Sequence, residues 1–275
     1  THFFLPQAYI VGMIAAILAK SKCKLIMSRR SLNLYQKNFP LSKTIEKFLH
    51  KKVDKILVNS KAVKNQLINK ENVSKNKIKI IYNGVDARYR KRDDRKYGKS
   101  SIIMIANLIP YKNHRMVLYA LNRIKEKLPK DWFIYFIGRD DGIRKDLVSL
   151  AEKLEIRKNT LFIHTKDIHS ILPDMSMGIL CSEEESFPNA ILEYFSHKVP
   201  VISSDVGGCK EIVKNKKNGI LLKENSDLEL SKAILYLYKN KKIAKKFGTE
   251  GFKIIKKKFT LNKMINEHER EYLEH

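Results

Sequence analysis

Short apolar runs rich in β-branched residues alternate along the chain with segments that carry one apolar face. We interpret nine of these runs as β-strands: Lys24–Met27, Lys55–Val58, Ile78–Tyr82, Ile102–Ala106, Phe133–Ile137, Thr160–Ile163, Gly178–Cys181, Val199–Ser203 and Gly219–Leu222. Between the fourth and fifth runs, apolar residues recur at helical spacing from Val117 to Leu128. Such alternation is typical of βα units, so the pattern predicts an α/β fold with parallel sheets.

A charged segment divides the chain into two parts. Residues 88–100 carry a dense run of charges and almost no apolar side chains, as expected of a linker between domains. Three of the expected strands precede this segment and six follow it. We therefore expect a partial Rossmann-like domain over residues 1–90, a linker over 91–100, a complete Rossmann-like domain over 101–252 and a C-terminal helix over 253–275.

The first apolar segment, from Phe3 to Ala19, has the composition of a signal peptide or a membrane span. It contains Pro6 and Gln7, and it is shorter than the about 20 residues that a span requires. No basic region precedes it, although a signal peptide would have one. We therefore expect a buried helix of an α/β domain. No strand is expected before this helix, which suggests that the sequence is incomplete.

The chain is strongly basic, because 55 Lys and Arg residues oppose 29 acids and give a net charge of +26. This surplus suits nucleic acid, anionic lipid or an acidic substrate. Since the lysines are spread along the whole chain, we interpret them mainly as a basic surface, with peripheral contact to an anionic membrane as a further expectation. The three cysteines lack CxxC spacing, which argues against a disulfide framework or a zinc site and suits the cytoplasm.

The strongest chemical signal lies between Ser182 and Val213. Glu185 and Glu193 stand eight positions apart across a junction of loop and helix, and an apolar strand, two glycines and Glu211 follow. Polar groups that follow strands in this way meet at the carboxyl edge of a parallel sheet, where ligands bind. An acid placed against a helix dipole would explain one of these carboxylates. It would not explain their spacing together with the glycine pair.

This segment resembles the nucleotide-sugar site of the retaining glycosyltransferases of family 4. The donor domain of that family carries a Glu-x7-Glu element, then a Pro-Val strand and Gly-Gly-x-x-Glu. The resemblance implies the GT-B fold, in which two Rossmann-like domains flank the active site. It also implies that a hexosyl group moves from a nucleotide-sugar, most simply a UDP-sugar, to a glycan or lipid-linked acceptor with retention of configuration. The family needs no bound metal and no cofactor beyond this co-substrate.

The same resemblance implies roles for individual side chains. Glu193 would accept hydrogen bonds from the ribose hydroxyls, and Glu185 would contact hydroxyls of the transferred sugar. Lys112, in the Ala106–His114 loop that resembles the first strand and loop of the donor domain, would neutralise the diphosphate. Glu185 and Lys112 are therefore the expected catalytic residues. The remaining donor contacts would be Asn107, Gly138, Phe187, Pro188 and Asn189.

Two of these donor contacts carry a specific expectation. Gly138 would let the nucleotide approach the backbone, and Asn107 stands where many family members have Arg.

The first half of the chain contributes fewer candidates. Arg29 and Arg30 follow a strand and could contact phosphate or an anionic acceptor, although an ordinary basic loop explains them equally well. Asn83-Gly84 resembles the hinge turn of the family and suits a turn with positive φ.

Two alternatives remain open from the sequence. A nucleotide-sugar epimerase or a sucrose- or glycogen-synthase-like enzyme would share the fold, but we do not find the acids and the His that such epimerases use. A catalytically inactive, basic pair of Rossmann-like domains could instead bind nucleic acid or anionic lipid. We favour the glycosyltransferase and expect no nucleic-acid partner. We expect it in the cytoplasm, with a peripheral position on the inner face of the membrane.

Overall fold

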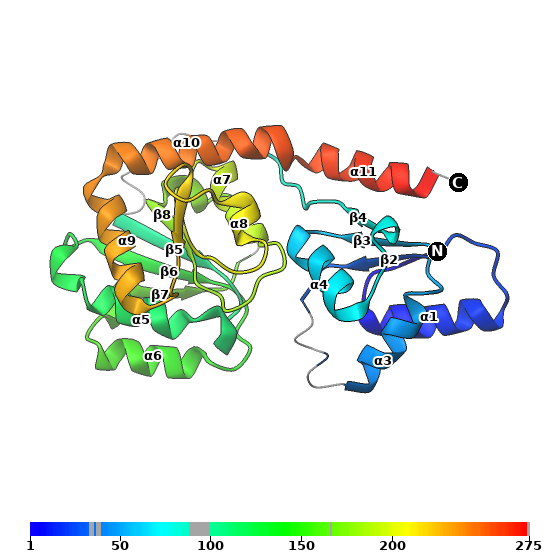
Figure 1. Cartoon of the computed structure of the whole chain (residues 1–275). Helices are drawn as coiled ribbons and strands as arrows, with labels where there is room; N and C mark the ends of the chain where they lie inside the picture. Colours follow the sequence, from blue (N-terminus) through cyan, green and yellow to red (C-terminus); the bar gives the residue numbers. More distant parts are fainter. Residues whose placement is uncertain (33–35, 37–39, 88–99, 166, 274–275) are drawn as a thin grey trace. The chain divides into compact units, whose positions relative to one another are not determined.

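The computed structural model describes residues 1–32, 36, 40–87, 100–165 and 167–273, and it contains two compact units. The first unit consists of Thr1–Asn83, Glu185–Phe187 and Met264–His275, and the second of Gly84–Glu184 and Pro188–Lys263. Each unit contains one parallel sheet (Figure 1), which confirms the predicted α/β fold with two parallel sheets. The division after Asn83 lies earlier than expected, and residues 91–99 of the expected linker lie outside the described residues.

The sheet of the first unit has four strands in chain order. They are β1 (His2–Phe3), β2 (Ile26–Arg29), β3 (Lys55–Val58) and β4 (Ile78–Ile80). The α-helices α1 (Pro6–Leu18), α3 (Pro40–Leu49) and α4 (Lys61–Glu71) follow β1, β2 and β3 in turn, and the short 3-10 helix η1 (Lys75–Lys77) precedes β4. Because parallel crossovers are right-handed, strands added in one direction place all their helices on one face. Figure 1 shows these helices together on one side of the sheet.

The C-terminal helix α11 (Leu261–Leu273) covers the other face of this sheet. Met264 packs against a small cluster formed by Ile26, Leu57 and Ile81. The buried Glu271 lies 3.6 Å from Lys55 and 3.4 Å from Lys79. The last helix of the chain is therefore part of the first unit. The single helix expected over residues 253–275 is instead the end of one helix and the whole of another.

The second unit contains a six-stranded sheet in the order β10-β9-β8-β5-β6-β7. Its strands are β5 (Ser100–Ile105), β6 (Trp132–Ile137), β7 (Thr160–Ile163), β8 (Met177–Leu180), β9 (Val201–Ser204) and β10 (Gly219–Leu222). The chain adds β6 and β7 on one side of β5, and then returns to add β8, β9 and β10 on the other. This order is that of a Rossmann-like fold, with a switch point between β5 and β8.

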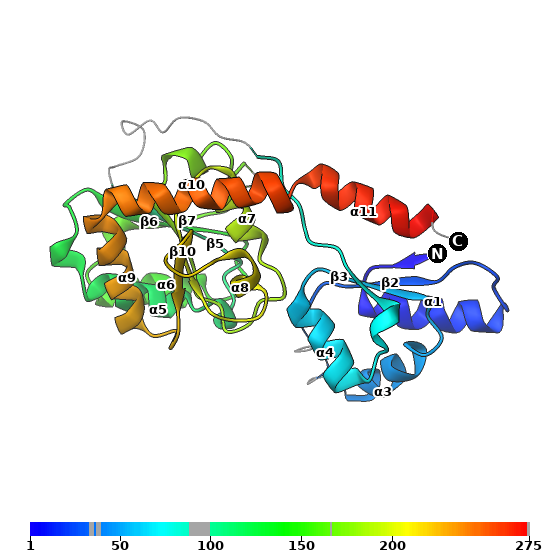
Figure 2. The same cartoon turned by 45° about the horizontal axis from the view of Figure 1, so that its top comes forward.

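Helices cover both faces of the second sheet. They are α5 (His114–Asn122), α6 (Arg144–Lys153), α7 (Asn189–Ser196), α8 (Cys209–Ile212), α9 (Asp227–Lys239) and α10 (Lys241–Lys258), with the 3-10 helices η2 (Pro110–Lys112), η3 (Lys125–Lys127), η4 (Arg157–Asn159) and η5 (Leu172–Asp174). The reversal of strand order places α5 and α6 on one face and α7 and α8 on the other. The long helix α10 packs against α7 and α9 (Figure 1, Figure 2).

Two expectations about local structure are wrong. A leading strand does exist, because His2 and Phe3 pair with Ile26 and Met27; two residues are too few for a sequence pattern to reveal. Asn83-Gly84 does not form a turn with positive φ. Gly84 is required there for a different reason, since a Cβ atom on it would lie 2.3 Å from the carbonyl oxygen of Thr260.

The apolar segment at the N-terminus is a helix, as expected, but most of it is exposed. Only Tyr9 and Met13 of α1 are buried, whereas Val11 and Leu18 are 69% and 78% exposed. Within the described part of the chain, no helix combines the length and the apolar character that crossing a membrane requires.

Candidate functional site

The switch point of the second sheet lies where β5 and β8 separate. The two strands pair at Ile102 with Met177 and at Ile103 with Gly178, and they diverge toward their carboxyl ends. In open α/β sheets, ligands bind in the crevice formed at such a point. Asn107 follows β5, Gly138 follows β6 and α7 follows β8, so the sheet brings the predicted residues of the second unit to one edge.

Tyr194 on α7 bridges the two diverging strands. Its hydroxyl accepts a hydrogen bond of 2.7 Å from the backbone N–H of Ile105 and donates one of 3.2 Å to the carbonyl oxygen of Ile179. The side chain is fully buried. The bridge anchors α7 at the switch point and satisfies two backbone groups that the separation leaves without a strand partner. Sequence reasoning missed Tyr194, although a Tyr on an apolar helix commonly needs a polar partner for its hydroxyl.

Glu193 precedes Tyr194 in the same helix and is half-buried. Burial raises the pKa of its carboxyl group. No residue in the described part of the chain donates a hydrogen bond to this carboxylate or forms an ion pair with it. Helix α7 begins at Asn189, and Pro188 before it provides no side-chain cap. An unpaired carboxylate and the N-terminus of a helix thus lie within two turns of each other at the switch point.

The loop that carries Lys112 is fastened to the loop after β8. Asn113 donates a hydrogen bond of 3.1 Å to the carbonyl oxygen of Cys181, and the N–H of Glu183 donates one of 2.9 Å to the carbonyl oxygen of Tyr111. Asn113 adopts a left-handed conformation with φ of 59°. The Lys112 ammonium lies 5.1 Å from the centre of the Tyr111 ring. Lys112 therefore belongs to the same edge of the sheet as the acidic loop that precedes α7.

His114 begins α5 and was not singled out from the sequence. It is almost fully buried, with its ring 5.2 Å from that of Phe136. Burial lowers the pKa of His114 to about 4; the charge of Lys112 acts in the same direction and a backbone group of Ala106 opposes it. Near neutral pH the imidazole is uncharged, so Lys112 supplies the positive charge of this loop.

Gly138 and Asn107 hold two strand ends together. A Cβ atom on Gly138 would lie 2.1 Å from the carbonyl oxygen of Ala106. Asn107 accepts a hydrogen bond of 3.3 Å from the N–H of Arg139. The reason that we expected for Gly138 therefore changes: the close approach that requires a glycine is that of the neighbouring strand end. The donor contacts of both residues stay predictions.

The predicted site residues are divided between the units. Glu185 and Phe187 are grouped with the first unit, whereas Asn107, Lys112, Gly138, Pro188, Asn189 and Glu193 belong to the second. Within the first unit, Ser186 donates a hydrogen bond of 2.7 Å to the carbonyl oxygen of Arg30. The Phe187 ring lies 5.1 Å from that of Tyr82. The short segment between Glu184 and Pro188 is thus tied to the end of β2 and to the segment after β4.

Arg29 has an internal role that the sequence did not reveal. Its guanidinium is buried, pairs with Glu46 and lies 3.6 Å from Glu71. His50 joins the cluster through contacts of 2.9 Å with both Glu71 and the Tyr9 hydroxyl. We therefore revise the expectation for Arg29, whose charge balances buried carboxylates inside the first unit.

The buried cluster also has the composition of a cation site. Glu46, His50 and Glu71 present ligand atoms within 4.8 Å of one another. Because the Arg29 guanidinium already contacts both carboxylates, we assign this cluster no metal.

Arg30 is exposed and donates a hydrogen bond of 2.7 Å to Asn83. It borders a cavity of about 170 Å³ and stays a candidate for contact with an anion.

The bridge made by Tyr194 yields a direct prediction. Tyr194→Phe removes the hydroxyl but keeps the ring, leaving the Ile105 N–H and the Ile179 carbonyl without this partner. We expect the free energy of unfolding of the second unit to fall by about 1–3 kcal/mol. Urea denaturation followed by circular dichroism measures it. Tyr236→Phe, on an exposed face of α9, is the matched control and should change it by less than about 0.5 kcal/mol. Equal effects would remove the structural role of the bridge.

Both parts of the chain match known protein families. Residues 85–254 match the family described as "Glycosyl transferases group 1". Residues 1–89 match the family described as "Glycosyltransferase Family 4". The first match covers more than half of the chain and contains the whole of the second sheet.

Two relatives with specific names align over much of the chain. The N-acetyl-alpha-D-glucosaminyl L-malate synthase of Bacillus anthracis is 28% identical over 224 residues, which are 77% of this chain and 58% of that protein. A 4-alpha-N-acetylgalactosaminyltransferase of Campylobacter jejuni, named for an N-acetylgalactosamine-N,N'-diacetylbacillosaminyl-diphospho-undecaprenol substrate, is 22% identical over 260 residues, 90% of this chain and 69% of that protein. The chain thus spans less than two thirds of the first of these relatives.

A solved structure shares the fold. The Anabaena protein HepE in complex with UDP aligns with a TM-score of 0.88 at 18% sequence identity, covering 98% of this chain and 78% of that one. With both family matches, this agreement confirms the predicted GT-B fold. The chain belongs to the group 1 glycosyl transferases and is a GT-B glycosyltransferase of family 4.

Proposed function

We propose that the chain transfers a hexosyl group from a UDP-sugar to a glycan or lipid-linked acceptor, with retention of configuration. One observation carries this proposal: the switch point of the second sheet combines the unpaired Glu193 carboxylate, the N-terminus of α7 and the Lys112 loop. A nucleoside diphosphate has a ribose diol, which can donate hydrogen bonds to a carboxylate. Its two phosphates can bind to a lysine and to a helix N-terminus. That HepE, a protein of the same fold, was solved with UDP supports the choice of nucleotide.

Glu193 is the proposed ribose contact. A carboxylate can accept two hydrogen bonds from the neighbouring hydroxyls of a ribose, as the acid of dinucleotide-binding folds does. Burial already disfavours the charged carboxylate in the free protein. Two hydroxyl donors would stabilise the charged form, so the binding of ribose and the ionisation of Glu193 favour one another.

The diphosphate would be held by Lys112 and by the start of α7. Backbone N–H groups at a helix N-terminus favour anions, and a lysine adds a mobile point charge. When the bond between the sugar and the diphosphate breaks, negative charge grows on the leaving group. Donors that are already in position lower the barrier to that step. No metal is needed in this scheme. We retain the expectations that Glu185 contacts hydroxyls of the transferred sugar and that Asn107, Gly138, Phe187, Pro188 and Asn189 contact the donor.

The acceptor side would lie at a membrane surface. The exposed apolar face of α1 includes Val11, Ile14 and Leu18, no acid stands in the helix, and Lys20 and Lys22 follow it. Apolar side chains beside lysines are the features that anionic bilayers attract. The diphospho-undecaprenol substrate in the name of the Campylobacter relative is a lipid of that setting. We therefore propose peripheral contact with the inner face of the membrane, with Arg30 available to an anionic acceptor.

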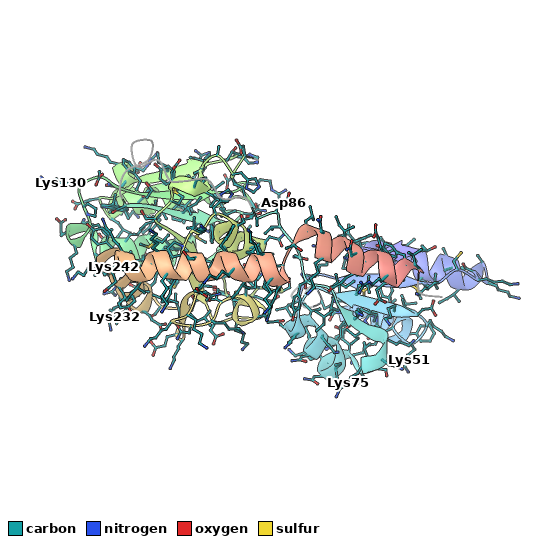
Figure 3. All side chains as sticks on the ribbon, turned by 90° about the horizontal axis from the view of Figure 1, so that it is seen from above. Lys51, Lys75, Asp86, Lys130, Lys232 and Lys242 are labelled. Atoms are coloured by element: carbon teal, nitrogen blue, oxygen red, sulfur yellow. The ribbon has the colours of Figure 1, made fainter. Side chains whose placement is uncertain are left out.

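Lys112→Ala should weaken binding of the diphosphate but not binding of the nucleoside. We expect the affinity for UDP to fall roughly ten- to hundredfold, since charge-assisted hydrogen bonds contribute about 1.5–3 kcal/mol. The affinity for uridine should stay within about twofold, because uridine has no phosphate. Isothermal titration calorimetry measures both, and Lys130→Ala, an exposed lysine labelled in Figure 3, removes the same charge as the control. Equal losses for UDP and uridine would mean that Lys112 only supports the fold.

The affinity for uridine should depend on pH through Glu193. Because burial raises the pKa of this carboxyl group, protonation begins at a higher pH than for an exposed Glu. As the pH falls from neutral through this raised pKa, the acceptor form is lost and binding weakens. Glu193→Gln should bind weakly at every pH in this range. It should also stabilise the free protein at pH 7, because it removes a carboxylate whose charge burial disfavours. A wild-type affinity that is flat with pH would refute the assignment.

Retention can be tested on the first product released. The chain is incubated with UDP-glucose, whose glucosyl group is α-linked, and with water as the simplest acceptor. Proton NMR during the first minutes, before the released sugar equilibrates, should show α-glucose. Lys112→Ala should lower the rate of release. Initial formation of β-glucose would show inversion and overturn this part of the proposal.

The proposed membrane contact predicts selective binding to anionic vesicles. The chain should sediment with vesicles that contain phosphatidylglycerol more than with pure phosphatidylcholine, and salt should weaken this binding. Val11→Ser combined with Leu18→Ser should lower the bound fraction several-fold. Leu228→Ser combined with Leu273→Ser changes two leucines that are also exposed, on α9 and α11, and should leave it unchanged. Equal binding of the two double variants would remove α1 as the contact.

A further inference from the structure

A second, larger cavity lies within the second unit. Its volume is about 560 Å³, and it borders Ser100 at the start of β5, Met177 at the start of β8 and Pro200 just before β9. Because these strands are parallel, the cavity lies at their amino ends, at the opposite edge of the sheet from Glu193 and Lys112. The volume falls within the roughly 300–1,000 Å³ that is typical of small-molecule sites. The nucleotide site does not account for it.

The lining of this cavity combines an apolar wall with positive charge. The wall includes the side chains of Ile102, Leu128, Met175, Met177, Val199, Ile234 and Leu237. Lys198, Lys241 and Lys245 also line it, and none of the described residues that border it is Asp or Glu. A cavity bordered by lysines has the charge to attract an anion, and its apolar wall has the surface to bury a hydrophobic body.

Ser100 gives an independent indication of a ligand. Its side chain is only 4% exposed, it lines the cavity, and its hydroxyl has no hydrogen-bond partner among the described residues. A buried hydroxyl without a partner destabilises the folded state, and native structures contain few of them. A ligand oxygen in the cavity would supply the missing partner.

Helix α10 adds to the positive end of the cavity. This 18-residue helix begins at Lys241, and the side chain of Asn240 before it does not cap the helix. The uncapped start of a helix carries partial positive charge and free N–H groups, which favour anions. Lys245 stands one turn further along, on the same face as Lys241. Both lysines border the cavity, so helix and side chains place their charge at the same end.

We propose that this cavity is a second binding site, separate from the nucleotide site, for a small anionic amphiphile. The phosphate of such a ligand would bind at Lys241, Lys245 and the start of α10, and its apolar body would lie against the wall formed by β5, β8 and α9. Ser100 would pair with an oxygen of the ligand. A soluble phosphate ester and the phosphate headgroup of a lipid share this chemistry, and the experiment below distinguishes them.

Octyl phosphate is the direct probe, used below its micelle concentration. Isothermal titration calorimetry should detect binding to the full chain. Octyl glucoside, which lacks the charge, and inorganic phosphate, which lacks the apolar body, should each bind at least about tenfold more weakly. Saturating UDP should not compete, because the two sites lie at opposite edges of the sheet. Vesicles of phosphatidylcholine with phosphatidic acid form a second arm of the same experiment.

Two double variants on α10 provide a matched comparison. Lys241→Ala with Lys245→Ala should weaken octyl phosphate about tenfold or more. Lys242→Ala with Lys246→Ala removes the same charge from the same helix, but neither residue borders the cavity, and affinity should stay within about twofold. Lys242 is labelled in Figure 3. Ser100→Ala should raise the melting temperature of the free chain while weakening octyl phosphate; a purely structural role would not produce both.

These measurements distinguish a soluble ligand from a lipid headgroup. Selective loss in the Lys241 and Lys245 variant, with octyl phosphate alone binding, supports a soluble ligand. The same selective loss on phosphatidic acid vesicles supports a lipid headgroup. Absence of octyl phosphate binding, equal losses in both double variants, equal binding of octyl glucoside, or displacement by UDP would each overturn the second site.

Discussion

The carboxyl edge of the second sheet depends on one bridge, the hydroxyl of Tyr194 between β5 and β8. Strands that separate leave backbone groups to be satisfied, and an unsatisfied group in a buried place is costly. Tyr194 meets this requirement with hydrogen bonds to Ile105 and Ile179. Since Glu193 is the preceding residue, the same contact determines where the carboxylate and the start of α7 lie. A requirement of the fold thereby positions the groups that we assign to the nucleotide.

The two units differ in whether their buried charged groups have partners. In the first, Arg29 is buried and balanced by Glu46 and Glu71, so the cluster satisfies itself. In the second, Glu193 is half-buried without a donor among the described residues. Removing charge from water without a partner costs free energy, which a ligand can return on binding. By this reasoning the first cluster supports the fold, and the second site is built for a partner.

Much of the fold could be predicted from local sequence. The features that could not be predicted have physical causes. The expected strands agree with the observed ones to within about two residues, because each contains a short run rich in apolar residues. The two-residue β1 is too short to form a pattern. Features that depend on distant contacts were not accessible: the partners of Arg29 and Tyr194, and the strand end that requires Gly138, come from separate elements. The Glu185–Glu193 spacing signalled the family, but no sequence pattern indicated that Glu185 would be grouped with the first unit.

The most direct test of this account is a crystal structure of the chain with UDP bound. We expect the ribose hydroxyls within hydrogen-bond distance of the Glu193 carboxylate, and the diphosphate against Lys112 and the first turn of α7. Tyr194 should keep its two backbone contacts in that complex. A nucleotide bound at another edge of the sheet, or a ribose turned away from Glu193, would contradict the assignment of the switch point as the donor site.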